Sequence, residues 1–393
     1  MTHNVSRLPK IPSDRADGNS SWVHRALIIT GELGRIQPLK LLPAWIALAA
    51  IAGWPWRALQ LPAILLSALF CAVDWAMLGL LPVKKRSWGP VTPSLLALTL
   101  ARAVLSWSGA LLAPTLTSLA LVAAIQALVS AAAIHATWIE PFRLTVTRIQ
   151  YHPPQWKSAP PLKILHISDL HFEGVSPREQ ALLAQVKALR PDLILLTGDY
   201  LNLSSVYDPA AQAGARAVLA QLHAPLGVYA VTGSPVVDIV GVVPEIFSTL
   251  DIHWLNDQAA VIKHGNINIQ LLGVRTTYDE NRDTTALRRL AQPAQEIDFT
   301  ALLYHTPDLM PVAAQGGVDL YLCGHTHGGQ IRLPFYGALA TSSRFGKRYE
   351  MGLYREGSCT LYVSRGLGME GLGAPRARFL APPEIVLWTF AAR

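Results

Sequence analysis

Two different hydrophobic patterns divide the chain. Residues 41–139 consist of long apolar runs separated by proline, glycine or charge, whereas short β-branched runs alternate with amphipathic stretches from residue 162 onward. The apolar runs of the first pattern are 41–56, 58–82, 94–113 and 115–138. Because a membrane-spanning helix needs about 20 apolar residues, we expect a bundle of about four transmembrane helices. The first run is short, so one half of a re-entrant hairpin remains an alternative for it.

The second pattern predicts a layered α/β fold, since strand-like and helix-like segments alternate along it. Strands are expected at 162–168, 192–197, 227–232, 267–274, 300–304, 320–323, 360–364 and 384–390. Helices are expected at 176–189 and 208–223, the first with Ser176 as N-cap and Glu179 at the capping-box position.

These patterns divide the chain into four segments. We expect a polar basic N-terminal segment at 1–40, a transmembrane helical region at 41–139, a linker at 140–161 and a soluble domain at 162–393. The linker assignment depends on the proline-rich sequence HPPQWKSAPP at 152–161, which is typical of a stiff spacer.

The distribution of charged residues predicts how the apolar half is oriented in the membrane. Apolar residues make up 51% of the chain and charged residues 15%, and only six charged side chains lie within 41–139, which excludes a purely soluble, a disordered or a fibrous protein. The net charge of +7 comes from the first 139 residues. Lysine and arginine precede the first span, separate the second from the third and follow the fourth. This distribution predicts a multi-pass protein of the cell membrane whose soluble domain faces the cytoplasm.

The same charge distribution bears on partners. A positive excess that flanks apolar spans favours contact with anionic membrane lipids. We expect no nucleic-acid partner, because the chain has no basic run and no basic–aromatic module.

Two charges lie inside the expected spans. Asp74 and Arg102 each lie about 12–14 Å deep from the same side, at about 1.5 Å of rise per residue. They favour a structural ion pair between the second and third helices, and contact with a lipid headgroup or substrate is the alternative.

Polar side chains follow five of the predicted strands, each at the point where the strand ends. These residues are Asp169 and His171, Asp199, Ser234, His305, and His325 with His327. Ligand sites of α/β sheets lie at the carboxyl ends of the strands, so we expect these side chains to meet. Oxygen and imidazole donors without a thiolate suit Mn, Zn or Fe.

The ordered set DxH, GD, His and GHTHGG resembles the calcineurin-like metallophosphoesterase family, and specifically its membrane-associated bacterial branch. The resemblance covers about residues 161–393, including the stretches ILHISDLHFEG, LLTGDYLN and CGHTHGGQI. It implies a β-sandwich flanked by helices, with two divalent metal ions at one edge.

The resemblance also implies roles for individual residues. Asp169, His171 and His327 would hold the first metal, and Asp199 would bridge both. His305 and His325 would hold the second metal, with Ser234 in the position of a further ligand. The residues implied to be catalytic are Asp199, His325 and His327.

One motif departs from the family pattern. Where the family has Gly-Asn-His, this chain has Gly233-Ser234-Pro235. A serine hydroxyl is a poorer ligand than an asparagine amide, and proline offers no proton donor. The departure therefore implies a weaker second metal and a substrate whose leaving group needs little protonation, such as a pyrophosphate. Asp238 is close enough in sequence to enter the gap.

These features together predict a membrane-anchored, dinuclear metal-dependent phosphoester hydrolase. Its substrate would be a lipid-linked phosphodiester or pyrophosphate, and a UDP-diacylglucosamine-like molecule is the best single choice. The alternative is a metal-binding but catalytically weak or inactive membrane scaffold or sensor, which the Ser234-Pro235 departure favours.

Three further features remain to be placed. A set of basic and aromatic residues forms either a solvated hairpin face or a cationic rim for substrate phosphate or anionic lipid. These residues are Arg344, Lys347, Arg348 and Arg355 with Phe335, Tyr336, Phe345, Tyr349 and Tyr354. His166 is expected to be a packed core histidine, and Cys323 a small buried apolar residue.

Overall fold

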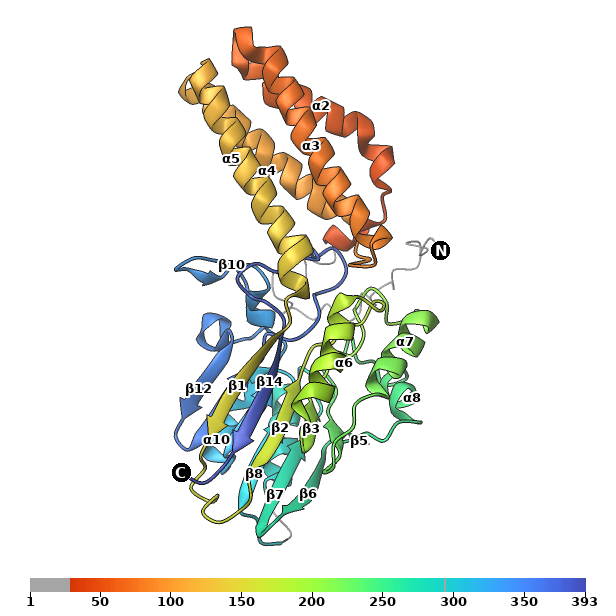
Figure 1. Cartoon of the computed structure of the whole chain (residues 1–393), viewed down its shortest axis with the longest axis vertical. Helices are drawn as coiled ribbons and strands as arrows, with labels where there is room; N and C mark the ends of the chain where they lie inside the picture. The colour runs from red at the N-terminus through yellow and green to blue at the C-terminus, as the bar shows by residue number, and fades with distance from the viewer. Residues whose placement is uncertain (1–28, 293–294) are drawn as a thin grey trace. The chain divides into compact units, whose positions relative to one another are not determined.

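The computed structural model describes residues 29–292 and 295–393 (Figure 1). Most of the polar N-terminal segment that we expected at 1–40 lies outside the described residues. The chain divides into two compact units. The first is Met1–Ile139 with Glu370–Ala377, and the second is Glu140–Met369 with Arg378–Arg393.

The first unit is helical. Its long helices are α2 (Leu42–Gly53), α3 (Gln60–Val83), α4 (Val91–Leu112) and α5 (Leu116–Ile134). Three helical stretches of the described chain are long and apolar enough to cross a membrane, namely Pro38–Val83, Val91–Leu112 and Leu116–Phe142. Our expectation of about four transmembrane helices is therefore corrected to three candidate stretches. The reason is the length of α2, whose 12 residues rise only about 18 Å.

The stretch Pro38–Val83 reverses direction within its length. Arg57, in the short 3-10 segment η4 (Trp54–Leu59), has φ 52° and ψ −116°, which breaks the helix between α2 and α3. A Cβ on Gly53 would lie 2.3 Å from Ile64, so the end of α2 lies against the start of α3. Trp45, near the start of α2, belongs to one buried cluster with Leu81, near the end of α3. The two helices are therefore antiparallel neighbours, as in the hairpin alternative.

A buried polar network connects three helices of this unit. Arg102 of α4 donates two hydrogen bonds to Asp74 of α3, both 2.7 Å long. It also donates to the Gln126 carbonyl oxygen and to Ser130 on α5, at 3.0 and 2.8 Å. The predicted ion pair between helices is confirmed. Both side chains are buried, and the additional hydrogen bonds are what a buried ion pair needs to offset its desolvation, so the structure favours the structural role over the headgroup alternative.

The second unit contains two six-stranded sheets. The first has the order β1 (Thr145–Tyr151), β14 (Glu384–Phe390), β2 (Leu162–Ile167), β3 (Leu193–Leu196), β4 (Val228–Ala230) and β5 (His253–Trp254). The second has the order β12 (Gly352–Glu356), β13 (Cys359–Val363), β9 (Leu320–Cys323), β8 (Phe299–Leu303), β7 (Ile267–Gly273) and β6 (Gln258–His264). A short hairpin of β10 (Arg332–Leu333) and β11 (Gly337–Ala338) follows β9.

The sheets pack face to face between two layers of helices. Along β3, Leu193 and Leu195 join the core between the sheets, whereas Ile194 and Leu196 join the core under the helices of the first sheet. Both faces of such a strand are buried, which explains its uninterrupted apolar sequence. Helices α6 (Pro177–Leu189), α7 (Pro209–Leu219) and α8 (Val243–Phe247) cover the first sheet, and α9 (Glu280–Leu290) and α10 (Met310–Gln315) cover the second. The predicted α/β sandwich flanked by helices is confirmed.

Parallel pairing brings the carboxyl ends of the central strands to one edge of each sheet. In the first sheet β2, β3 and β4 are parallel, and in the second β7, β8 and β9 are parallel.

Helix α6 begins as predicted, because Ser176 caps it and Glu179 completes the capping box. Cys323 and His166 are fully buried, as expected.

Part of the expected linker is a strand. Residues Thr145–Tyr151 form β1, which pairs in parallel with β14 along its whole length. All its side chains are half-buried except the exposed Arg148 and Gln150, so the apolar run that marks a central strand is missing. We assigned the segment to the linker because of the prolines that follow it.

Candidate metal centre

The predicted ligands lie together at the carboxyl edge of the sandwich. Asp169 and His171 follow β2, Asp199 follows β3, and Ser234 follows β4. The second sheet supplies the remaining residues, His305 after β8 and His325 with His327 after β9. The structure therefore brings together every residue that the sequence singled out for this site.

Five of these residues hold a strained backbone. Their φ angles are positive: Asp169 51°, His171 40°, Asp199 57°, His325 68° and His327 51°. Such conformations cost about 1–3 kcal/mol each and persist where the surrounding structure fixes them, commonly at functional sites. The turns after the strands thus direct these side chains into the site, and the cost is conformational strain in the backbone.

Two glycines make the crowding possible. A Cβ on Gly324 would lie 2.0 Å from Asp169 Oδ2, and one on Gly233 would lie 2.1 Å from Asp199 Oδ1. Any side chain at either position would displace a carboxylate of the site. Both glycines are needed for close approach of the backbone.

Asp169, His171 and His327 form the first donor group, with their ligand atoms within 4.8 Å of one another. The Nε2 atoms of His171 and His327 are 3.0 Å apart, and His327 Nε2 lies 3.7 Å from Asp169 Oδ1. The Nδ1 atom of His171 is buried without a hydrogen-bond partner. This group matches the set that the resemblance assigns to the first metal.

The second donor group consists of Asp199, His305 and His325, again with ligand atoms within 4.8 Å of one another. Asp199 Oδ2 lies 3.2 Å from His305 Nε2 and 3.4 Å from His171 Nε2 of the first group. The carboxylate of Asp199 therefore faces both groups, which is the position that a bridging ligand requires.

Ser234 occupies the gap that the altered motif leaves in the second group. Its hydroxyl lies 3.2 Å from Asp199 Oδ2, 3.2 Å from His305 Nε2 and 3.5 Å from His325 Nδ1. The backbone N–H of Ser234 also donates to Asp199 Oδ1 at 2.6 Å. The serine oxygen thus lies among the donors.

Burial and mutual charge set the protonation of the second group. Burial disfavours the His305 cation, but the neighbouring Asp199 carboxylate overrides this effect and raises the pKa of His305 to about 10. Burial also opposes ionisation of Asp199, yet the two histidines His305 and His171 hold its pKa below the usual range. Burial, helped by the His305 charge, lowers the pKa of His325 to about 3. Without a metal, the protein itself places a positive charge beside Asp199.

The donor set fits two divalent cations. Each group offers one carboxylate and two imidazoles, and all six side chains are buried except for the partly buried ring of His325. Oxygen and nitrogen donors of this kind suit Zn, Mn or Fe, and ligation by a neutral imidazole would release the extra proton of His305.

Asp238 lies behind the site and organises its backbone. Its carboxylate accepts hydrogen bonds from the N–H groups of Asp199 at 2.8 Å, Gly233 at 2.7 Å and Tyr200 at 3.0 Å. Burial, helped by the charge of Asp199, raises the pKa of Asp238 to about 7. Both carboxylate oxygens bond to backbone, so Asp238 supports the altered loop and does not join the donors.

Arg378 is a site residue that the sequence did not reveal. The side chain is fully buried, and its guanidinium lies 3.2 Å from Nδ1 of His327. It also donates to the carbonyl oxygens of Gly368 and Ala381, and burial lowers its pKa to about 9. No motif surrounds Arg378 in the sequence; only the fold places it behind His327.

The basic segment at 344–355 is largely neutralised. Arg344 pairs with Glu280, and Arg348 pairs with Glu356. Lys347 lies 3.5 Å from Glu350. These pairs favour the solvated hairpin face over the cationic phosphate rim.

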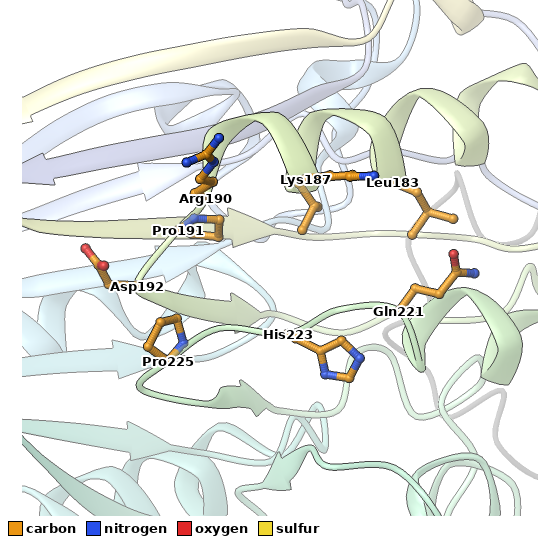
Figure 2. A pocket seen from close by; sticks show the side chains of 9 residues that line it. Leu183, Lys187, Arg190, Pro191, Asp192, Gln221, His223 and Pro225 are labelled. Atoms are coloured by element: carbon orange, nitrogen blue, oxygen red, sulfur yellow. The ribbon is translucent and has the colours of Figure 1, made fainter.

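A groove of about 520 Å³ lies elsewhere on the second unit. Figure 2 shows Lys187, Arg190 and His223 around it, together with Pro191 and Asp192, which directly precede β3. Because Asp199 follows the other end of β3, the groove lies at the opposite edge of the sheet and is separate from the metal centre.

Comparison with known proteins agrees with this geometry. The family model for calcineurin-like phosphoesterases matches residues 162–329. The metallophosphoesterase YkuE of Bacillus subtilis is 33% identical over 236 residues, which cover 58% of this chain and 78% of that protein. The phosphodiesterase YaeI of Escherichia coli is 33% identical over 217 residues, covering 54% and 77%. The UDP-2,3-diacylglucosamine pyrophosphatase LpxG of Chlamydia trachomatis is 28% identical over 307 residues, covering 65% and 91%.

The fold and the paired donor groups define a metal-dependent phosphoester hydrolase. The chain belongs to the calcineurin-like phosphoesterase family. The resemblance to the calcineurin-like family that rested on the DxH, GD and GHTHGG motifs is thereby confirmed, and with it the assignment as a metallophosphoesterase, whereas the membrane-associated branch stays a prediction.

Proposed function

We propose that this chain is a membrane-anchored hydrolase with two divalent metal ions, of Mn, Zn or Fe, that acts on a lipid-linked phosphodiester or pyrophosphate. The observation that carries the proposal is the position of Asp199. Its Oδ2 atom lies 3.2 Å from His305 Nε2 in one donor group and 3.4 Å from His171 Nε2 in the other.

The residues of the site would divide the work as follows. Asp169, His171 and His327 would hold the first metal, and His305, His325 and Ser234 would hold the second, with Asp199 shared. Metals bound there would supply Lewis-acid polarisation of the phosphoryl oxygens. The rings of His325 and His327 would also lie beside the reacting phosphate and help to offset its developing charge.

The altered loop limits what the chain can do for the leaving group. Pro235 has no side-chain donor, and the oxygens of Asp238 already accept three backbone hydrogen bonds. General acid catalysis matters least when the departing group is already stable as an anion. A phosphate that leaves from a pyrophosphate meets this condition, whereas an alkoxide does not.

Two observations support a lipid-linked substrate. Three helical stretches are long and apolar enough to cross a membrane, and β1 begins three residues after the last of them ends at Phe142. The similarity to LpxG, named for its action on UDP-2,3-diacylglucosamine, points to the same class of substrate. A UDP-diacylglucosamine-like molecule is our best single choice.

The proposed orientation places the catalytic unit in the cytoplasm. If α2 and α3 enter and leave the membrane on one side, α4 and α5 cross it twice more and return to that side. The basic clusters before Leu42, at Lys84–Arg86 and after Phe142 then all lie on the cytoplasmic face.

The test uses the full chain, purified in detergent and analysed for bound metals. We expect two divalent ions per chain and hydrolysis of UDP-diacylglucosamine that exceeds hydrolysis of an alkyl phosphodiester. Metal-loaded protein that hydrolyses neither the pyrophosphate nor a nitrophenyl diester would contradict the proposal.

The second candidate is a metal-binding scaffold or sensor with little or no catalysis. The replacement of the family's Asn-His by Ser234-Pro235 favours it, because both a ligand and a proton donor are lost. It predicts bound metal without turnover of either substrate in the same experiment.

A further inference from the structure

The hairpin of β10 and β11 carries an exposed apolar tip. Phe335 is fully exposed, and Leu333, Tyr336 and Leu339 are each about half exposed. Phe335 also holds a positive φ of 64° at the turn. Figure 1 shows the ribbon around β10 projecting from the body of its unit. Large apolar side chains at an exposed turn contact water unless a partner covers them.

The hairpin is attached to the metal centre at both of its ends. It begins directly after the His327–Gly329 turn, and Arg332 donates to the Gly328 carbonyl oxygen at 2.7 Å. On the returning side, a Cβ on Gly329 would lie 2.3 Å from the Cβ of Ala338, so β11 packs directly against the same turn. The apolar tip is therefore continuous with the two histidines of the GHTHGG motif.

Tyr336 at the tip and the neighbouring Lys347, which also pairs with Glu350 at 3.5 Å, are residue types found at membrane interfaces. The Lys347 ammonium lies 3.5 Å from the centre of the Tyr336 ring and also contacts the Tyr336 carbonyl oxygen. Tyrosine and lysine with an apolar body and a polar end are enriched where hydrocarbon meets headgroups. Arg332 is paired with Glu350 at 2.9 Å, so it is not available for a phosphate.

We infer that the tip Leu333–Tyr336 inserts into the surface of the lipid bilayer next to the metal centre. This inference depends on the proposed membrane attachment, because the chain itself then holds the catalytic unit at a bilayer. Apolar side chains of interfacial segments reach about 5–10 Å into the boundary between headgroups and acyl chains. The insertion would bring a lipid-linked phosphate to His325 and His327 without its extraction into water.

The test places a fluorescent label on the tip of the full chain. The native Cys71, Cys323 and Cys359 are all buried, so a Phe335→Cys variant can be labelled selectively with an environment-sensitive fluorophore. The matched control is Lys263→Cys, an exposed position on β6 that pairs with Asn268 near the start of β7, at the sheet edge opposite the site. Both proteins are reconstituted into vesicles of phosphatidylcholine and phosphatidylglycerol, with plain or brominated acyl chains.

We expect brominated lipid to quench the emission from position 335, because insertion places the label at the boundary with the acyl chains, and to leave the emission from position 263 unchanged. Equal quenching at the two positions would overturn the inference. The inference would also be overturned if the emission of the 335 label indicated an apolar environment only at high protein concentration. That result would show that a second copy of the chain, and not lipid, covers the tip.

An activity measurement separates this inference from the proposed function. Phe335→Asp is expected to leave hydrolysis of a water-soluble nitrophenyl diester unchanged and to slow hydrolysis of a bilayer-embedded pyrophosphate lipid. An inactive wild-type chain whose 335 label is still quenched would refute the catalytic proposal alone. An active chain whose label is not quenched would refute the insertion alone.

Discussion

Asp199 connects the two halves of the metal centre, and its surroundings show how a single carboxylate is held in place. Its backbone has a φ of 57°, its N–H donates to Asp238, and its Oδ1 accepts from the N–H of Ser234. These contacts offset the strained backbone. The side chain can therefore face histidines from both sheets at once.

Under the proposed function Ser234 would be a ligand of the second metal, so substitutions at this residue test that site. Its hydroxyl already lies among the donors, 3.2 Å from both Asp199 Oδ2 and His305 Nε2. We expect Ser234→Asn to tighten the second metal, because an amide oxygen is a better ligand than a neutral hydroxyl, whereas Ser234→Ala should loosen it. Titration with a chelator, followed by metal analysis, measures how strongly each protein retains the second metal. We expect retention to fall in the order Asn, Ser, Ala at position 234. Equal retention in all three proteins would show that the serine is not a ligand.

Pro235 tests the role of the missing proton donor. Pro235→His should speed cleavage of an alkyl phosphodiester and change cleavage of a nitrophenyl ester or a pyrophosphate little, since general acid catalysis typically contributes about 10²–10⁴-fold. The measurement is the ratio of alkyl to nitrophenyl turnover at equal metal occupancy. If the ratio stays at the wild-type value, the missing histidine does not set substrate preference.

The residues that the structure brings together at this edge could be predicted from the sequence because each lies within four residues after an apolar strand. Asp169 and His305 lie two residues after their strands and Asp199 three residues after its strand, so local sequence shows both the residue type and its place at the sheet edge. Asp238 and Arg378 could not be assigned in this way. Their roles depend on backbone N–H groups and on a histidine that only the fold brings near them.

Among the strands and helices, too, the sequence reveals only those elements that carry a clear apolar pattern. Strand β9 was predicted because all four of its residues are apolar and buried. Strand β1 was missed because the prolines that follow it led us to assign 140–161 to a linker, although TVTRIQY is rich in β-branched residues and pairs with β14 along its whole length. Helix α9 was missed because its sequence ENRDTTALRRL buries only Asp283 and Leu287.

The ion pair between α3 and α4 gives an element-scale prediction. Asp74→Leu or Arg102→Leu alone leaves a buried charge without its partner, a change that typically costs about 3–5 kcal/mol. The double variant removes both charges and should recover most of this loss. Thermal unfolding of the full chain in detergent measures it. Additive destabilisation in the double variant would mean that the pair does not act as a unit.

The whole molecule combines an apolar helical unit with a hydrolytic unit of the calcineurin-like family. Positive charge clusters beside the apolar stretches on what would be a single face, if Pro38–Val83 forms a hairpin within the membrane. Such an arrangement would keep the catalytic unit at the surface from which a lipid-linked substrate is presented.

The orientation is tested by a reporter fused after Arg393. We expect the reporter to register the cytoplasm, and a second fusion at Ala113, between α4 and α5, to register the opposite side. The same location for both fusions, or an external signal after Arg393, would show that the helices cross the membrane in another way.

The central claim is that one carboxylate serves two metals in a working hydrolase. The most direct measurement compares Asp199→Asn with Asp251→Asn, a charge-matched change at an exposed position, for bound metal, thermal unfolding and hydrolysis of a nitrophenyl diester. We predict that Asp199→Asn remains folded, loses metal and slows hydrolysis by more than the 10–100-fold typical of changes outside the ligand shell, while Asp251→Asn matches wild type. Wild-type turnover in the folded Asp199→Asn protein would contradict the account.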